Sequence, residues 1–360
     1  MEQIIFIDEN IPLLANAMNS CGKITCFSGR SLTNRLLIDS GCTSLFIRST
    51  TKVSRVLIDG TNVKFIGSAT SGIDHVDTEF LISKKIKFCF APGSNANSVA
   101  EYVVFSILAW GFNTKSEIQN KTIGIVGFGN IGNIVANYSK YLGLNILVND
   151  PILKDEGFVF PNFVQYAGLE EICTSADIIT NHVPLTIEGL YPTYKLFNKN
   201  LRLIKSGSLF IHTSRGGVVD ESELLLKIKS DNILTAIDVW ENEPCINREL
   251  VSESLISTPH IAGYSKNGKI RGAKMMAEAF RNFTGLEPDF SEINKELAVY
   301  HPMSPDSFRD YNNIYNLLSI SRELVQDTFN LKEIIQSGID DKDDIFDKLR
   351  KNYAQRCEIL

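Results

Sequence analysis

Residues 121–150 read KTIGIVGFGNIGNIVANYSKYLGLNILVND, and this stretch decides the fold. An apolar run of strand character, residues 121–126, leads into a glycine-rich turn, residues 127–132, and then into a segment of helical period. A second apolar run, residues 145–150, follows the helical segment. A strand, a GxGxxG turn, a helix and a second strand together form the unit that binds dinucleotides in Rossmann folds.

Each position of the glycine-rich turn has a physical reason. Gly127 permits a tight turn, Gly129 lets a pyrophosphate approach the backbone, and Gly132 allows close packing of helix against sheet. Asn130 and Ile131 open the helix, whose free N–H groups can bind an anion. The alternative is an ordinary glycine-rich turn, but its place between strand and helix favours a cofactor site.

Asp150 ends the second strand, 23 residues after Gly127. A carboxylate at this place can accept hydrogen bonds from the adenosine ribose hydroxyls, and it would repel the 2′-phosphate of NADP. The sequence therefore predicts NAD as the cofactor. A surface aspartate without this role is the alternative.

Apolar runs rich in Ile, Val and Phe alternate with helical segments over the first 285 residues or so, which is typical of βαβ units and parallel sheets. Besides the two runs above, we predict strands at 4–8, 23–27, 44–48, 63–67, 86–92, 177–183, 207–214, 233–240 and 255–260. We predict an α/β fold with two doubly wound parallel-sheet domains. A substrate-binding, flavodoxin-like domain covers residues 1–94 and is completed by a return helix at 264–285, and an NAD-binding Rossmann domain covers 95–263. Residues 286–360 lose the strand pattern and are predicted to form a small, mainly helical domain that docks on the main body or on a second subunit.

The composition is that of an ordinary globular protein, with 44% hydrophobic and 22% charged residues. The 36 basic and 42 acidic residues give a net charge of −6, which argues against binding to nucleic acid. No run is long and apolar enough for a membrane span, and the N-terminal residues do not read as a secretory signal, so we expect a cytoplasmic protein. The five histidines show no metal-binding spacing, and no metal is predicted.

Three side chains with catalytic potential, Arg215, Glu243 and His260, each follow a different predicted strand of the second sheet. Parallel strands end at one edge of their sheet, so these side chains can converge there. Oxidation of an alcohol beside a carboxylate needs a base, a cation and a hydride acceptor. His260 can be the base, Arg215 the cation, and NAD the acceptor, while Glu243 orients His260.

The motifs GFGNIG, SRGGVVDESEL, IDVWENEP and TPHIAG stand in the order and spacing of a known family. The sequence resembles the D-isomer-specific 2-hydroxyacid dehydrogenases over residues 1 to about 285. The resemblance implies that Arg215, Glu243 and His260 are the catalytic triad. It also implies that Asp238 lies near the nicotinamide carboxamide and that Gly263 contacts the cofactor.

Further motifs resemble one branch of this family: IDENIP, FIRSTTKV, IGSATSGIDHVD, APGSNANSVAEYV, TPHIAGYSKNGKIRG and FDKLRKNYAQR. The resemblance implies oxidation of a small phosphorylated hydroxy acid and a homodimer formed through the C-terminal domain. The resemblance implies that Ser49, Thr70 and Tyr264 bind substrate. Val183 stands where relatives can carry a cofactor-binding threonine. The hydroxyl contact is lost there, but the resemblance still implies a cofactor position at Val183, with contacts from the backbone. The chain ends at Leu360, where relatives can continue, which implies a shorter dimerisation domain.

The phosphorylated substrate that the resemblance implies carries a carboxylate and a phosphate, and Arg215 can neutralise only one of these two groups. Arg48, Ser49 and Lys52 follow a predicted strand and offer two cations and a hydroxyl, so we predict that they bind the phosphate. The alternative is an ordinary turn between a strand and a helix, capped by Ser49 or Thr50.

Two other functions fit the same motifs. One is a dehydrogenase for another small D-2-hydroxy acid, such as 3-phosphoglycerate. The other is an NAD-sensing binding protein, which would associate with a partner in the presence of cofactor and show negligible turnover.

Overall fold

The computed structural model describes residues 3–300, 302–337 and 342–360, without the side chains of residues 342–345. By its contacts the chain divides into two compact units. Unit 1 comprises Met1–Asn95 and Ser265–His301, and unit 2 comprises Ala96–Tyr264 and Pro302–Leu360. Each unit is built on its own parallel sheet, which confirms the predicted fold class.

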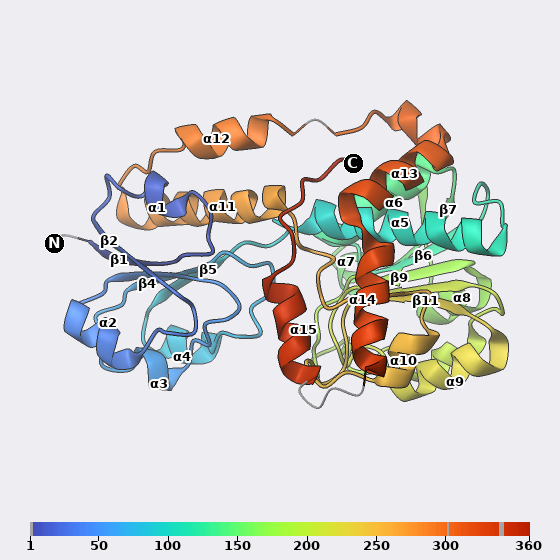
Figure 1. Ribbon diagram of the computed structural model, residues 1–360, viewed down its shortest axis with the longest axis horizontal. Coiled ribbons are helices and arrows are strands. Elements are labelled where there is room, and N and C mark those ends of the chain that lie inside the picture. The colour runs from blue at the N-terminus through green and yellow to red at the C-terminus, as the bar shows by residue number, and fades with distance from the viewer. Residues whose placement is uncertain (1–2, 301, 338–341) are drawn as a thin grey trace. The chain divides into compact units, whose positions relative to one another are not determined.

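The sheet of unit 1 has the order β2-β1-β3-β4-β5, with every pair parallel (Figure 1). Its strands are β1 (Ile4–Asp8), β2 (Lys23–Phe27), β3 (Ser44–Ile47), β4 (Phe65–Ser68) and β5 (Lys87–Phe90), all at predicted apolar runs. The strand order reverses between β1 and β3. In open α/β sheets, ligands bind outside the carboxyl ends of the strands at such a reversal.

Helices cover both faces of this sheet. Neighbouring residues of β1 accordingly point to opposite faces and belong to different apolar clusters. Ile5 and Ile7 pack with Met276 and Phe280, whereas Phe6 packs with residues of the helices on the other face. The helices of unit 1 are α1 (Leu14–Ala17), α2 (Asn34–Ser40), α3 (Arg55–Ile58), α4 (Thr78–Ser83), α11 (Lys266–Thr284) and α12 (Ser291–Ala298). The long helix α11 ends at Gly285, whose φ of 75° stops it as the sequence predicts.

The sheet of unit 2 has the order β12-β11-β10-β9-β6-β7-β8 and is also parallel throughout. Its strands are β6 (Thr122–Val126), β7 (Asn145–Asn149), β8 (Val164–Tyr166), β9 (Ile178–Asn181), β10 (Leu209–His212), β11 (Leu234–Ile237) and β12 (Ile256–Ser257). Strand β8 was not predicted, because its three residues contain no apolar run. The strand order reverses between β6 and β9, next to the glycine-rich turn.

Helices on unit 2 include α5 (Ala96–Thr114), α6 (Asn130–Tyr141), α7 (Pro151–Asp155), α8 (Leu169–Ser175), α9 (Glu221–Asp231) and α10 (Arg248–Glu253), with 3-10 turns at η1 (Asn198–Leu203) and η2 (Pro305–Arg309). Most of α5 is buried, including Glu101, which is fully inaccessible to solvent. Within the described part of the chain, no helix has both the length and the apolar character that crossing a membrane requires.

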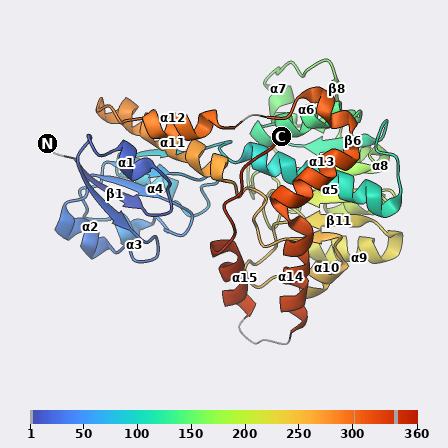
Figure 2. The ribbon, with the colours of Figure 1, turned by 45° about the horizontal axis from the view of Figure 1, so that its top comes forward.

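The last helices are α13 (Tyr311–Arg322), α14 (Leu324–Gln336) and α15 (Lys342–Lys351). The sequence predicts one helical stretch over 310–336, but the chain breaks at Glu323, where φ is 49°. Helix α13 contacts α5, and α14 contacts β12, α10 and α15. Figures 1 and 2 show α14 and α15 side by side. By its contacts, the segment Pro302–Leu360 belongs to unit 2. A separate C-terminal domain over residues 286–360 stays a prediction.

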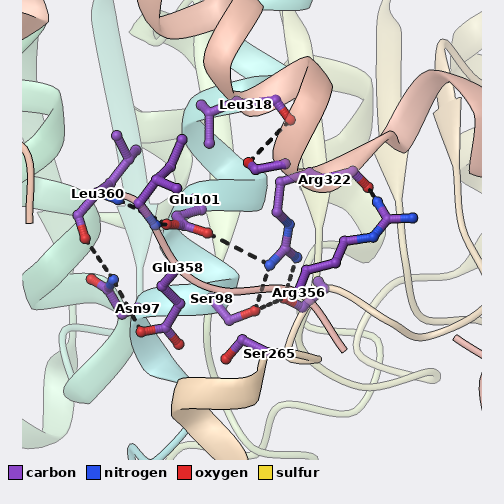
Figure 3. Close-up of polar contacts among 12 residues, drawn as sticks. Asn97, Ser98, Glu101, Ser265, Leu318, Arg322, Arg356, Glu358 and Leu360 are labelled. Atoms are coloured by element: carbon purple, nitrogen blue, oxygen red, sulfur yellow. Dashed lines mark hydrogen bonds and ion pairs between the residues drawn. The ribbon is translucent and has the colours of Figure 1, made fainter. Parts of the chain in front are cut away.

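The C-terminal segment is fixed to α5 by buried polar contacts (Figure 3). Glu101 accepts hydrogen bonds from the backbone N–H groups of Ile359 and Leu360. Arg322 at the end of α13 lies 3.6 Å from the Glu101 carboxylate (Nη1 to Oε2) and donates hydrogen bonds to the Ser98 hydroxyl and the Ala262 carbonyl. The side chains of Glu101 and Arg322 are both completely buried.

Candidate active site

The glycine-rich turn has the close approaches that its sequence predicts. Gly127 has a φ of 90°, and a Cβ atom there would lie 2.9 Å from the His182 carbonyl oxygen. A Cβ on Gly132 would lie 2.1 Å from the Gly127 carbonyl oxygen, so any side chain would push α6 away from the turn. A Cβ on Gly129 would meet nothing within 4 Å. The turn is therefore tight on its inner side and open at Gly129, where a pyrophosphate needs room.

The start of α6 is also open. Asn130 is exposed and Ile131 is half-buried, and the first N–H groups of the helix have no partner from a capping side chain. Val183 follows β9 on the other side of the strand reversal, and its Cγ1 would lie 3.0 Å from a Cβ on Gly127. The structure thus brings the predicted cofactor residues of β6, α6 and β9 together. These residues fit a dinucleotide.

Asp150 lies at the end of β7, as predicted, and its carboxylate supports the turn directly. Oδ2 accepts a hydrogen bond of 2.8 Å from the N–H of Phe128, and Oδ1 accepts one of 3.1 Å from the N–H of Leu153 at the start of α7. Each carboxylate oxygen has a second lone pair. Asp150 can therefore hold the glycine-rich turn and still accept hydrogen bonds from a ribose.

Asp238, directly after β11, is almost fully buried and fixes the loop that carries His260. Its carboxylate accepts hydrogen bonds from the Thr258 hydroxyl (2.7 Å) and from the N–H groups of Ile261 (2.7 Å) and Ala262 (2.9 Å). Burial raises the pKa of Asp238, although these bonds and the nearby His260 oppose the shift. This anchoring role was not predicted from the sequence. A contact with nicotinamide stays a prediction, and so does a cofactor contact at Gly263, which is half-buried just beyond the anchored loop.

Glu243 and His260 form the predicted pair. The His260 Nδ1 atom lies 2.8 Å from Oε2 and 3.0 Å from Oε1 of Glu243, and the N–H of Trp240 donates a bond of 3.1 Å to Oε1. Burial would raise the pKa of Glu243, but the hydrogen bond and charge of His260 bring it below its ordinary value, with help from Arg350. Glu243 is therefore ionised and can only accept hydrogen bonds.

This geometry determines the tautomer of His260. An ionised carboxylate accepts hydrogen bonds, so Nδ1 carries the proton that it donates to Glu243. In the neutral ring Nε2 is then the atom with a free lone pair, which can take a proton from a substrate hydroxyl. His260 has a φ of 56°, in the left-handed region that residues other than glycine rarely adopt. The backbone N–H of His260 donates to the Asp238 carbonyl and helps to hold this conformation.

Arg215 lies in the loop after β10, beside the strand that leads to Glu243. Its Nη1 donates a hydrogen bond of 2.8 Å to the Ser214 carbonyl. The neighbouring Gly216 lies so close to the next loop that a Cβ would be 2.0 Å from the Trp240 carbonyl oxygen. The loops that carry Arg215 and Glu243 are thus packed together. Tyr264, half-buried beyond His260, has its ring 6.0 Å from that of Tyr353 in the C-terminal segment.

In unit 1, the predicted substrate residues lie at the carboxyl ends of β3 and β4. Arg48 is half-buried and donates to the Asn10 carbonyl, whereas Ser49 and Lys52 are exposed. Thr70 follows β4, and its hydroxyl bonds to the Ser68 hydroxyl at 2.6 Å and to the Gly72 carbonyl at 2.9 Å. Arg48, Ser49 and Lys52 therefore lie at the strand reversal of this sheet.

The structure adds two cations that the sequence analysis did not single out. Lys269, in the first turns of α11, has its pKa lowered to about 8 by burial and by the charge of Arg48. Arg350 on α15 lies 3.7 Å from Glu243 (Nη1 to Oε2). Both lie far along the chain from the residues they affect, and only the fold brings them close. The position of Lys269 in the TPHIAGYSKNGKIRG motif was the available signal.

Comparison with known proteins agrees with this geometry. Residues 108–262 match the family model of the D-isomer specific 2-hydroxyacid dehydrogenase, NAD binding domain. The chain belongs to the D-isomer specific 2-hydroxyacid dehydrogenase family and is an NAD-dependent 2-hydroxyacid dehydrogenase.

Within the family, the chain is similar to enzymes named erythronate-4-phosphate dehydrogenase. That of Wigglesworthia glossinidia brevipalpis is 38% identical over 358 residues, which cover 98% of this chain and 92% of that protein. That of Proteus mirabilis is 37% identical over the same shares.

Solved structures of other dehydrogenases share the fold. D-lactate dehydrogenase from Aquifex aeolicus, in complex with NAD and lactic acid, has a TM-score of 0.63 and 21% identity, over 79% of this chain and 96% of that one. Cofactor-bound 3-phosphoglycerate dehydrogenase from Entamoeba histolytica has a TM-score of 0.66 and 22% identity, over 79% of this chain and 97% of that one.

Proposed function

We propose that this enzyme oxidises 4-phospho-D-erythronate to (R)-2-oxo-3-hydroxy-4-phosphobutanoate with NAD, a step of pyridoxal 5′-phosphate (vitamin B6) biosynthesis. The observation that carries the proposal is the similarity to erythronate-4-phosphate dehydrogenases, which extends over 98% of the chain at 35–38% identity. It includes the C-terminal helices. A cytoplasmic location stays a prediction of the sequence.

The triad supports the chemical step. Nε2 of His260 takes the proton of the C2 hydroxyl, and Glu243 stabilises the imidazolium that results. Arg215 binds the substrate carboxylate and polarises the oxygen on C2. NAD, when bound, accepts the hydride from C2. One hydride and one proton leave the alcohol, so C2 becomes a carbonyl.

Residues of the glycine-rich turn and its neighbours would hold the cofactor. The open backbone at Gly129 and the start of α6 would bind the pyrophosphate, and Asp150 would bind the adenosine ribose. Val183, Asp238 and Gly263 are proposed to lie along the nicotinamide half. None of these contacts depends on a side-chain hydroxyl at position 183.

Arg48, Ser49 and Lys52 are proposed to bind the substrate phosphate, together with Lys269. Arg48 and Lys269 repel each other, and this repulsion helps to lower the pKa of Lys269 to about 8. A bound phosphate dianion would relieve the repulsion. Thr70 and Tyr264 are proposed as further substrate contacts.

A substrate panel tests the proposal. Purified protein with NAD is given 4-phospho-D-erythronate, 3-phosphoglycerate, D-lactate or D-glycerate, and NADH formation is followed by absorbance. A 2-oxo acid is added as an acceptor, because slow NADH release could hide turnover. Selective turnover of phosphoerythronate supports the proposal. Preference for another acid contradicts the substrate, and NAD binding without turnover of any acid favours the sensor.

The phosphate site has its own test. Ser49→Ala and Lys52→Ala are expected to raise the KM for the phosphorylated substrate and to leave the KM for an unphosphorylated acid unchanged. A KM for the phosphorylated substrate equal to that of the wild type would contradict the assignment.

We further propose that the protein forms a homodimer through its C-terminal helices. Leu317 and Ile320 on α13 and Val325 and Phe329 on α14 expose apolar side chains, each pair on one helical face. Exposed apolar faces of this kind are typical of subunit interfaces. Ile320→Asp is expected to shift the protein to monomers in sedimentation experiments, whereas Val159→Asp, at another exposed apolar position, leaves the dimer intact. Equal masses for wild type and Ile320→Asp would contradict this interface.

A further inference from the structure

Arg350 extends from α15 to the Glu243–His260 pair. Its Nη1 atom lies 3.7 Å from Oε2 of Glu243, too far for a hydrogen bond but within ion-pair range. Glu243 thus keeps both of its carboxylate oxygens on Nδ1 of His260. Arg350 adds a positive charge beside the pair without competing for its hydrogen bond. Asp347, on the same helix, lies 3.9 Å from the same Nη1 atom (Oδ1), but it is 41% exposed, so solvent screens its opposing charge.

Packing holds Arg350 in this place. Phe346, one turn earlier on α15, is 2% exposed and belongs to the apolar cluster that contains Trp240, whose N–H donates to Glu243. The Arg350 guanidinium lies 5.9 Å from the Phe346 ring centre, and its Nε atom is buried without a hydrogen-bond partner among the described residues. Two residues beyond α15, Tyr353 contacts the ring of Tyr264.

The other titratable groups near the pair do not replace this charge. His212, beneath the strand ends, has its pKa lowered to about 3 by burial and is neutral. Asp238 acts on His260, and Glu221 acts on Glu243, but both are acids. Among the described residues, two positive groups lower the pKa of Glu243: His260, which is its hydrogen-bond partner, and Arg350.

We propose that Arg350 is a positioning residue that acts through Glu243 and sets the pH range in which His260 works as a base. Glu243 alone would favour the imidazolium form of His260 and withhold the neutral ring that oxidation needs. The charge of Arg350 offsets part of the Glu243 charge and shifts the balance towards neutral imidazole. The C-terminal helix α15 is then part of the machinery of the site. This inference rests on the proposed roles of Glu243 and His260.

The experiment is the pH profile of kcat/KM for oxidation of the best substrate of the panel. Arg350→Gln is expected to move the acid limb to higher pH by about 0.5–1 unit, a modest shift for a partly exposed charge. Activity on the acid side then falls about 3–10-fold, while activity on the alkaline plateau changes little. Arg350→Lys, which keeps the charge, is expected to restore most of the wild-type profile.

Lys351→Gln is the matched control, because it removes one positive charge from an exposed position of the same helix. The decisive variant is Arg350→Gln combined with Glu243→Gln. It should shift the acid limb, relative to Glu243→Gln alone, by clearly less than Arg350→Gln shifts it in the wild type, because without Glu243 the arginine loses the ion pair that holds it beside His260. A full shift in that double variant, or a higher KM with unmoved limbs, would overturn the proposal. If His260→Asn and Glu243→Gln themselves keep normal turnover, the proposed catalytic roles fail instead.

Discussion

Unit 2 contains two glutamates that face cations, one completely buried and one half-buried, and their surroundings differ. Glu101 and Arg322 are completely inaccessible to solvent, and the contacts of Glu101 join α5 to the C-terminal part of the chain (Figure 3). Glu243 and His260 keep 18% and 30% of their side-chain surfaces exposed. The Glu101–Arg322 pair is closed to solvent, whereas the Glu243–His260 pair is accessible enough to exchange a proton with a bound molecule.

Their environments shift the two acids in opposite directions. Burial raises the pKa of Glu101 to about 7, and Arg322 and the N–H groups of residues 359 and 360 only partly offset it. Glu243 is less deeply buried, and the hydrogen bond and charge of His260 bring its pKa below the ordinary value. The same kind of residue therefore fixes the C-terminal segment to α5 in one place and is proposed to act as a fixed charge for catalysis in the other.

The comparison shows that a buried acid beside a cation is not by itself a sign of function. Position decides between the two readings. Glu243 and His260 follow neighbouring strands β11 and β12 at the edge of a parallel sheet, where ligands bind, and His260 has a strained backbone. Glu101 lies in the middle of a buried helix.

Among the variants that separate the two pairs, His260→Asn is expected to change catalysis most. Turnover is expected to fall by about 10²–10⁴-fold, because the base is lost. Asparagine tolerates the left-handed conformation that His260 adopts, so the fold should be little affected. Steady-state kinetics and thermal unfolding are measured on the same sample. Near-normal turnover would refute the role of His260.

The Glu101–Arg322 pair is expected to affect stability and to leave turnover unchanged. Arg322→Met leaves Glu101 buried without its cation and removes the bonds to Ser98 and Ala262, so the free energy of unfolding is expected to fall by about 3–5 kcal/mol. Denaturant unfolding measures this loss, while kcat of the folded fraction stays near the wild-type value.

Arg309→Met is the matched control, because Arg309 and its partner Asp306 are almost fully exposed. If both arginine variants lose the same stability, the buried pair has no special structural role.

The sequence predicted eleven of the twelve strands found in the part of the chain that the structure describes, because apolar runs of this kind are local signals. It also predicted the Glu243–His260 pair, since strand ends of one parallel sheet must meet. It missed α12, whose only buried residue among those described is Ile293, and the break at Glu323. The apolar pair Ile293 and Leu297 of α12 is too short a pattern to identify a helix, and the residues around Glu323 contain no turn sequence.

The polar contacts of the C-terminal helices could not be predicted for a different reason. Arg350 meets Glu243, and Arg322 meets Glu101, through helix packing between segments far apart in the chain. No periodicity of either segment determines which face of one helix meets which loop. The position of Arg350 in the FDKLRKNYAQR motif pointed to the relatives but not to the active site.

The smallest expected effect compares the two acids through the pH dependence of stability. The folded state raises the pKa of Glu101 from 4.5 to about 7, so the stability that this residue contributes is present below pH 4.5 and is lost as the pH rises to about 7. For Glu243 the shift is downward, so its contribution is present above pH 4.5 and is lost as the pH falls.

Glu101→Gln mimics the protonated acid at every pH. The melting temperature of the wild type minus that of Glu101→Gln is therefore expected to decrease from pH 5 to pH 8, and the same difference for Glu243→Gln should decrease only towards acid pH. Glu221, whose pKa burial raises to about 7, stays in all three proteins and cancels in these differences. Parallel curves for wild type and Glu101→Gln would mean that Glu101 binds no extra proton on folding, and the contrast between the two acids would then rest on geometry alone.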